Sequence, residues 1–219
     1  EVGYFSSELV QNGNFSELGS ELVTNGGFST NSDWVLPTGW SINNGKAIAN
    51  FSGGATGRLT QNISFVQNKT YKVVFTISDY EQGNIRIEFR QGGGNTISGG
   101  YTGNGTHTLY QVAAQNHTQL SIRGLGDAVL KVDNISVKQV DPNDRWGVEG
   151  SSTLNFADFQ GKSQVAKINI LNTNTISRVR QPFNYVSGTK YKISVEVYLV
   201  SGSFRVDSFD SFVSSDFVS

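Results

Sequence analysis

Tyr71-Lys72-Val73-Val74-Phe75-Thr76-Ile77-Ser78 is the stretch of sequence that decides the fold. Its apolar side chains fall at every second position from Val73 to Ile77, and Lys72, Thr76 and Ser78 occupy the other side. Side chains two residues apart point to the same face of a β-strand. This period of two therefore predicts a strand that buries one face and exposes the other.

Further short strands are expected C-terminal to this stretch. Residues 85–90 alternate in the same way, and residues 119–123 and 132–137 are two more short runs. Residues 123–127, Arg-Gly-Leu-Gly-Asp, are expected to form a hairpin turn, because the Lys-Ser/Thr of a phosphate-binding loop does not follow them. Turn-forming clusters separate the runs, at residues 43–45, 91–95 and 103–105.

The composition agrees with a fold made of strands. Charged residues make up only 16% of the chain and glycine accounts for 25 of its 219 residues, which favours many short strands joined by polar turns. Aromatic residues reach 11%, enough to build cores, so a disordered chain is not expected. No window shows helical periodicity, and the spacing of the runs predicts an all-β, antiparallel sandwich or barrel.

Charge and cysteine content exclude several functional classes. The formal net charge is −1 and the basic residues are scattered, so we expect no binding to nucleic acid. No apolar run approaches the roughly 20 residues of a membrane helix, so we expect no membrane insertion. Cysteine is absent, which excludes disulfides and thiolate metal sites.

A short motif occurs twice near the N-terminus. Residues 8–16, ELVQNGNFS, repeat as residues 21–29, ELVTNGGFS, and only the second copy is followed at once by a full set of predicted strands. The first copy is either the remnant of a preceding module or a strand that pairs elsewhere in the chain.

A longer repeat divides the rest of the chain. Residues 58–66 align with residues 178–186 at an offset of 120, and residues 69–77 align with residues 189–197 at the same offset. We therefore expect an N-terminal segment at 1–19, a complete module at 20–140 and an incomplete second copy at 146–219, joined by a polar linker. The incomplete copy and the lack of an initial Met predict that the sequence is a piece of a longer chain. We expect this chain to be oligomeric, because repeated weak sites gain avidity when several copies are presented together.

Several of these stretches together carry a family resemblance. They are Glu21–Phe28, Trp34, Gly39-Trp40, Thr70–Phe75 and Val132–Val137. In this order they resemble a carbohydrate-binding module of the cellulose- and xylan-binding jelly-roll type, which belongs to the galactose-binding-like sandwiches. The resemblance covers residues 20–140 and, more weakly, 146–219. Asn- and Gly-rich modules of this kind are similar to those in virion proteins of tailed bacteriophages.

The resemblance implies a tandem jelly-roll architecture and a glycan-binding face. It also implies a structural calcium ion near the closing Asp133, although Ser29 stands where the family frequently has an acidic ligand. It further implies that Trp40 is buried, whereas Trp34 is equally consistent with the core and with a platform for a sugar ring.

The outward side chains of residues 85–90 are the candidate glycan site. Arginine, glutamate and amide groups bind sugar hydroxyls, and aromatic rings stack on the C–H faces of sugars. The alternative is that these charges only protect an exposed strand against aggregation. The candidate residues are Tyr80, Arg86, Glu88, Arg90, Gln91 and Tyr101.

No catalytic function is expected. His107 and His117 lie far from any nucleophile motif, and Asp79, Glu81 and Glu88 are explained as solvated charges rather than a glycosidase pair.

The resemblance and the repeats favour a virion or extracellular structural protein, of the tail-fibre, adaptor or decoration type, that adheres to surface polysaccharide and contacts other virion proteins. Two alternatives stay open. The chain is an accessory glycan-binding pair of a secreted polysaccharide-degrading enzyme, or it is an architectural module without a glycan site.

Overall fold

The computed structural model describes residues 7–91, 94–171, 177–206 and 217–218. Within these ranges the chain forms strands and turns but no helix, so none spans a membrane, and the fold is all-β and antiparallel as the sequence predicts. The strands are β1 (Trp40–Asn43), β2 (Lys46–Asn50), β3 (Gly57–Phe65), β4 (Thr70–Gln91), β5 (Gly94–Ile97), β6 (Gly105–Val112), β7 (His117–Gln139), β8 (Gly147–Glu149), β9 (Ser152–Phe159), β10 (Lys162–Ile170), β11 (Arg178–Arg180), β12 (Ser203–Phe204) and β13 (Phe217–Val218).

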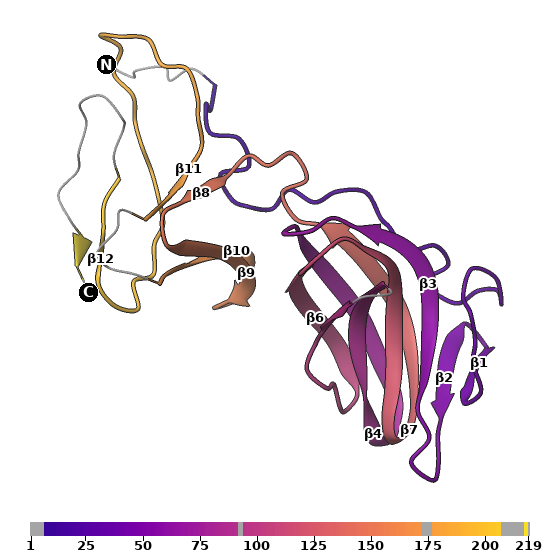
Figure 1. Ribbon diagram of the computed structural model, residues 1–219. Helices are drawn as coiled ribbons and strands as arrows, with labels where there is room; N and C mark the ends of the chain where they lie inside the picture. The colour runs from indigo at the N-terminus through magenta and orange to yellow at the C-terminus, as the bar shows by residue number, and fades with distance from the viewer. Residues whose placement is uncertain (1–6, 92–93, 172–176, 207–216, 219) are drawn as a thin grey trace. The chain divides into compact units, whose positions relative to one another are not determined.

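Two long strands, β4 and β7, build a two-layered sandwich by running antiparallel to each other through both layers (Figure 1). In the first layer the start of β7 and the end of β4 pair with each other, and β3 and β5 flank them. In the second layer the start of β4 and the end of β7 pair, with β6 on one side and β2 and β1 on the other.

The passage of β4 and β7 between the layers corrects two expectations from the sequence. Residues 71–78 and 85–90 lie on one strand, and residues 123–127 continue β7 instead of forming a hairpin turn. Gly83 and Gly126 have φ of 76° and 63°, values that an L-residue adopts only with strain, and they bend the strands without ending them. A Cβ at Gly83 would lie 2.5 Å from the Ala128 Cα, so the two strands cross here in close contact.

The core fills the space between the layers. The inward side chains of β4 are buried as the alternation predicts, from Tyr71 at 1% exposed to Phe89 at 0%. The Tyr71 ring, from the second layer, meets the Phe89 ring edge to face at a centroid distance of 5.7 Å, and Phe65 stacks on Phe89 at 3.9 Å. These contacts join the two faces and close the sandwich.

Both tryptophans that precede β2 belong to this core. Trp40 is 6% exposed and its indole N–H donates to the Gly57 carbonyl, which confirms the prediction of a buried Trp40. Trp34 is also 6% exposed and packs on Phe28 at a ring distance of 5.3 Å. Neither ring is free to act as a platform for a sugar.

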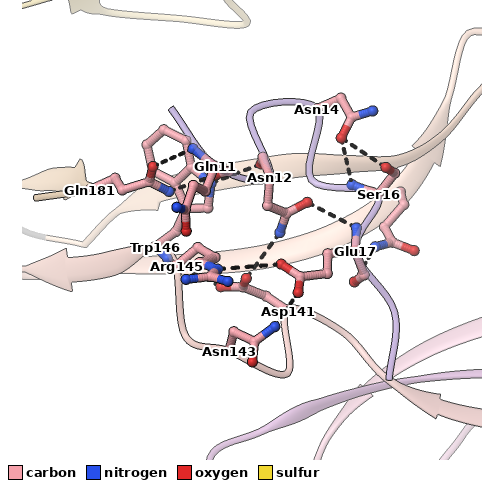
Figure 2. Close-up of polar contacts among 11 residues, drawn as sticks. Gln11, Asn12, Asn14, Ser16, Glu17, Asp141, Asn143, Arg145, Trp146 and Gln181 are labelled. Atoms are coloured by element: carbon pink, nitrogen blue, oxygen red, sulfur yellow. Dashed lines mark hydrogen bonds and ion pairs between the residues drawn. The ribbon is translucent and has the colours of Figure 1, made fainter. Parts of the chain in front are cut away.

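The first copy of the short motif packs against the chain that follows β7, not against the sandwich (Figure 2). The Phe15 ring lies 5.0 Å from the Trp146 ring, and the Asn12 amide donates to Asp141 over 2.9 Å. Glu17 accepts a hydrogen bond from Asn143 and forms an ion pair with Arg145. Residues 8–16 form a turn rather than the strand that one interpretation of the repeat expected.

The remaining elements are small. β9 and β10 form a hairpin, β8 pairs with β11, and β12 pairs with β13. The chain divides by its internal contacts into Glu1–Phe183 and Asn184–Ser219. Residues 189–197, which align with the start of β4, form no strand here, and a lone strand without partners is not stable in water. The module boundaries at 20–140 and 146–219 stay a prediction.

Candidate functional site

The outward surface of the first layer is the candidate site. Register places Arg86 opposite Arg123 and Arg123 opposite Arg58, across β4, β7 and β3. Two residues along β4, Glu88 stands opposite Ser121 in the same way. We call this surface the arginine face, and its members are Arg58, Arg86, Glu88, Arg90, Ser121 and Arg123.

Glu88 is the centre of the arginine face. Its side chain is 0% exposed although its strand position points away from the core, because the surrounding arginines cover it. The Arg58 Nε lies 2.8 Å from Glu88 Oε2 and donates a hydrogen bond to it. Arg90 Nε approaches the same oxygen at 3.8 Å, and Arg123 Nη1 approaches Oε1 at 3.9 Å. A buried carboxylate needs such partners to keep its charge.

Several polar atoms of the arginine face have no hydrogen-bond partner among the described residues. They are Glu88 Oε1, Arg90 Nε, Ser121 Oγ and Arg123 Nε. Ser121 is 0% exposed, so its hydroxyl lies at the floor of the surface. Buried polar groups are normally satisfied, so unsatisfied donors and acceptors gathered at one place mark the surroundings of Glu88 as an unusual polar cluster.

Polar and apolar side chains border the arginine face. Gln119 and Asn95 flank Arg90 on β7 and β5, and Asn62 lies beyond Gln119 on β3. Ile97, 47% exposed, lies opposite Glu88 on β5. Beyond β3 the surface continues into a shallow depression of about 220 Å³, which is lined by Thr24, Asp33, Val35, Thr60, Gln61 and Asn62.

The two tyrosines that the sequence analysis included in the candidate site, Tyr80 and Tyr101, are not members of the arginine face in the structure. The Tyr101 ring turns inward and meets Phe75 at 5.0 Å, and burial raises the pKa of its hydroxyl. Tyr80 lies at the bend of β4 and donates to the Gly83 carbonyl. Gln91 ends β4, and its side chain lies outside the described residues. Arg86, Glu88 and Arg90 share one face, as the alternation predicts.

Asp133 is the residue near which the resemblance implies a structural calcium ion. Asp133 accepts a hydrogen bond from the Asn134 backbone, and Ser29 donates to Asn25. No group of three or more acidic, histidine or cysteine side chains gathers anywhere in the described part of the chain. Calcium stays a prediction from the resemblance, and no step below depends on it.

Half of the arginine face was not recognised in the sequence. Arg58, Ser121 and Arg123 come from β3 and β7, which lie about 30 residues away from Glu88 in the chain. One feature of the sequence could have indicated Arg58: the long repeat has an arginine in both copies, at Arg58 and at the aligned Arg178.

Comparison with known proteins finds similarity to solved structures. No protein-family model matches the chain, and neither does any curated protein. Solved structures that match include a chain entitled "CBM4 structure and function", with 17% sequence identity and a TM-score of 0.38. The match covers 59% of this chain and 99% of that one. Part of this chain is thus distantly similar to that solved structure.

Proposed function

We propose that this chain is a non-catalytic carbohydrate-binding protein and that the arginine face is its binding surface. The observation that carries the proposal is the Glu88 carboxylate, fully buried on an outward face between three arginines, with unsatisfied donors and acceptors around it.

The chemistry of sugars supports this assignment. Each hydroxyl both donates and accepts hydrogen bonds, and neighbouring hydroxyls suit a surface that offers both kinds of group side by side. Arg90 and Arg123, each about a third exposed, donate, and the exposed side-chain amides of Asn62 and Asn95 both donate and accept. Hydrogen bonds with a charged partner are roughly twice as strong as neutral ones, which favours this arrangement over an uncharged one.

The shape of the first layer also supports the proposal. Four adjacent strands, β5, β4, β7 and β3, present an extended surface rather than an enclosed cavity, and such a surface accommodates a polymer. Ile97 supplies an exposed apolar contact for a sugar C–H face. Since Trp34 and Trp40 are buried, recognition would rest on polar contacts more than on ring stacking.

The proposal extends to the setting in which the chain works. The tandem repeat and the sequence resemblance to virion modules support adhesion to a surface polysaccharide, outside a cell or on a virus particle. Weak sites gain avidity when several copies are presented together, so an oligomeric parent protein fits this role.

The test is binding of the full chain to a panel of polysaccharides, compared between the wild type and two variants. Arg123→Gln removes a donor from the arginine face. Lys138→Gln removes one positive charge from the outward face of the second layer, where Lys138 lies opposite Lys72. We expect Arg123→Gln to lose about tenfold in affinity, the effect of one charge-assisted hydrogen bond, and Lys138→Gln to bind as the wild type does.

Two results would contradict the proposal. One is no binding to any polysaccharide by a folded wild-type chain, which would favour the architectural alternative. The other is equal loss in Arg123→Gln and Lys138→Gln, which would mean that overall charge and not the arginine face decides binding.

A further inference from the structure

The arginine face carries far more positive charge than the chain as a whole. Four arginines and one glutamate leave it with a formal charge of +3, while the whole chain has −1. Glu88 forms one close contact, with Arg58, and lies 3.8 and 3.9 Å from Arg90 and Arg123. One carboxylate therefore neutralises only a part of this cluster.

The arginines beside Glu88 retain free hydrogen-bonding capacity. Arg90 Nε and Arg123 Nε have no hydrogen-bond partner but are shielded from solvent, so the exposed part of each side chain, 32% and 27%, lies at its other atoms, the terminal nitrogens among them. A guanidinium group has five donors in a fixed plane and binds carboxylate or sulfate through two of them at once.

We propose that the ligand of this surface is an acidic carbohydrate, whose carboxylate or sulfate groups are bound by the exposed guanidinium nitrogens of Arg90 and Arg123, while the buried Glu88 holds these arginines from beneath. This inference rests on the proposed function. Glu88 holds the arginines in place and repels an anion from its own position, so the acidic group binds beside it.

A nucleic acid fits the same charge less well. Single-stranded nucleic acids are bound by aromatic rings on which the bases stack, together with basic groups. The members of the arginine face include no aromatic residue, and Tyr101 turns its ring to the core. A carbohydrate, whose recognition here depends on hydroxyl and acidic groups, is the better match.

The experiment uses one polymer in two forms, a polyuronate and the same polymer with its carboxylates reduced to alcohols, with a sulfated polysaccharide as a third arm. We expect the full chain to bind the polyuronate at least tenfold more tightly than the reduced polymer, and Arg90→Gln to abolish that preference. A preference for the sulfated polymer alone would identify sulfate as the acidic group.

The outcomes separate this inference from the proposed function. Equal binding of the acidic and reduced polymers, lost in Arg123→Gln, would overturn the acidic ligand and leave carbohydrate binding intact. Binding to neither would overturn both. Binding to single-stranded DNA in preference to every polysaccharide would overturn the acidic-carbohydrate assignment and point to a nucleic acid.

A second inference comes from a different observation, the place of the first motif copy. Both copies fold into the same turn: the Phe28 N–H donates to the Asn25 carbonyl at 3.1 Å, and the Phe15 N–H donates to the Asn12 carbonyl at 3.0 Å. Asn12 and Asn25 have φ of 50° and 53°.

Each turn holds a tryptophan in the same way. The Trp34 indole N–H donates to the Asn25 carbonyl at 3.1 Å, and the Phe28 ring lies 5.3 Å from the Trp34 ring. Trp146 makes the same two contacts with the first copy of the motif. Its indole N–H donates to the Asn12 carbonyl at 3.0 Å, and its ring lies 5.0 Å from the Phe15 ring.

The long repeat supplies the remaining partners. The Gln61 side chain exchanges two hydrogen bonds with the Thr24 backbone, at 2.9 and 2.7 Å. Gln181, which aligns with Gln61, exchanges the same two bonds with the Gln11 backbone, both at 2.6 Å. The strand pairing repeats as well. Val35, which follows Trp34, pairs with Thr60, which precedes Gln61. In the same way Gly147, which follows Trp146, pairs with Arg180, which precedes Gln181.

We infer that residues 8–16 open the second module and that the first module, residues 20–140, is inserted between this opening segment and the remainder that begins at Trp146. The first motif copy is then not a remnant. The hairpin of β9 and β10 depends on it, because Gln164 of β10 donates to the Phe15 and Glu17 carbonyls and Phe156 of β9 contacts the Phe15 ring.

The test is hydrogen exchange of backbone amides in the full chain. We expect Phe15→Ala to raise exchange at least tenfold in β9 and β10 and to leave β4 and β7 unchanged. Gln61→Ala is the matched control, with faster exchange at Thr24 and none of this effect in β9 and β10. Unchanged exchange of β9 and β10 in Phe15→Ala would overturn the inference, as would equal changes in β4.

Discussion

Replacing Glu88 by Gln tests the balance of forces at the centre of the arginine face. The substitution keeps the size of the side chain and removes its charge. Glu88 is fully buried, and Arg58 donates to it over 2.8 Å while Arg90 and Arg123 lie at 3.8 and 3.9 Å. The neutral amide would leave Arg58, Arg90 and Arg123 without their common charged partner.

The magnitude follows from these contacts. A hydrogen bond to a charged group contributes about 1.5–3 kcal/mol and a neutral one about 1 kcal/mol, so the Arg58 contact loses about 1 kcal/mol. The two longer ion pairs involve arginines that are about a third exposed, and each contributes at most about 1 kcal/mol. Burying an amide costs less than burying a carboxylate, which offsets part of the loss. The free energy of unfolding should fall by about 1–3 kcal/mol.

Urea unfolding of the full chain measures this loss as a lower midpoint with an unchanged slope. Arg86→Gln is the control, because Arg86 lies on the same row but is exposed, and it should change the stability by less than about 0.5 kcal/mol. Unchanged or increased stability of Glu88→Gln would show that the cost of burying the carboxylate exceeds its attraction to the arginines, and would refute the reasoning.

Two further predictions concern the core and the bend of β4. Burial lowers the pKa of His117 below its ordinary value of 6.5, so the unfolded chain takes up the proton first as the pH falls. Stability should therefore decrease below about pH 6.5, by at most about 1.4 kcal/mol per pH unit, and His117→Asn should reduce this dependence in urea unfolding at pH 5 and 7.5. Gly83→Ala should cost about 2 kcal/mol or more, because its Cβ would lie 2.5 Å from the Ala128 Cα at a φ of 76°. Gly53→Ala, at a φ of 64° with open space around it, should cost only about 1 kcal/mol in the same measurement, and equal losses would contradict the close crossing.

The sequence by itself determined the all-β class of the fold and the part of the arginine face that lies on β4, namely Arg86, Glu88 and Arg90. The alternation from Tyr71 to Ser78 depends only on the geometry of a strand, so the buried side of β4 was predictable residue by residue. The same rule put Arg86, Glu88 and Arg90 on one outward face. The burial of Trp40, which the family resemblance implied, is confirmed in the structure.

Only the tertiary structure decided which strands lie beside that row. The period of two gives the face of a strand but not its neighbours, and register brings Arg58 and Arg123 to Glu88 from distant parts of the chain. The bends of β4 and β7 follow from left-handed residues that the sequence shows as ordinary turn formers. The first motif copy likewise contacts a distant residue, since the Gln11 backbone N–H donates to the Gln181 side chain 170 residues away. No local sequence pattern predicts this contact, because it depends on the long-range arrangement of the chain.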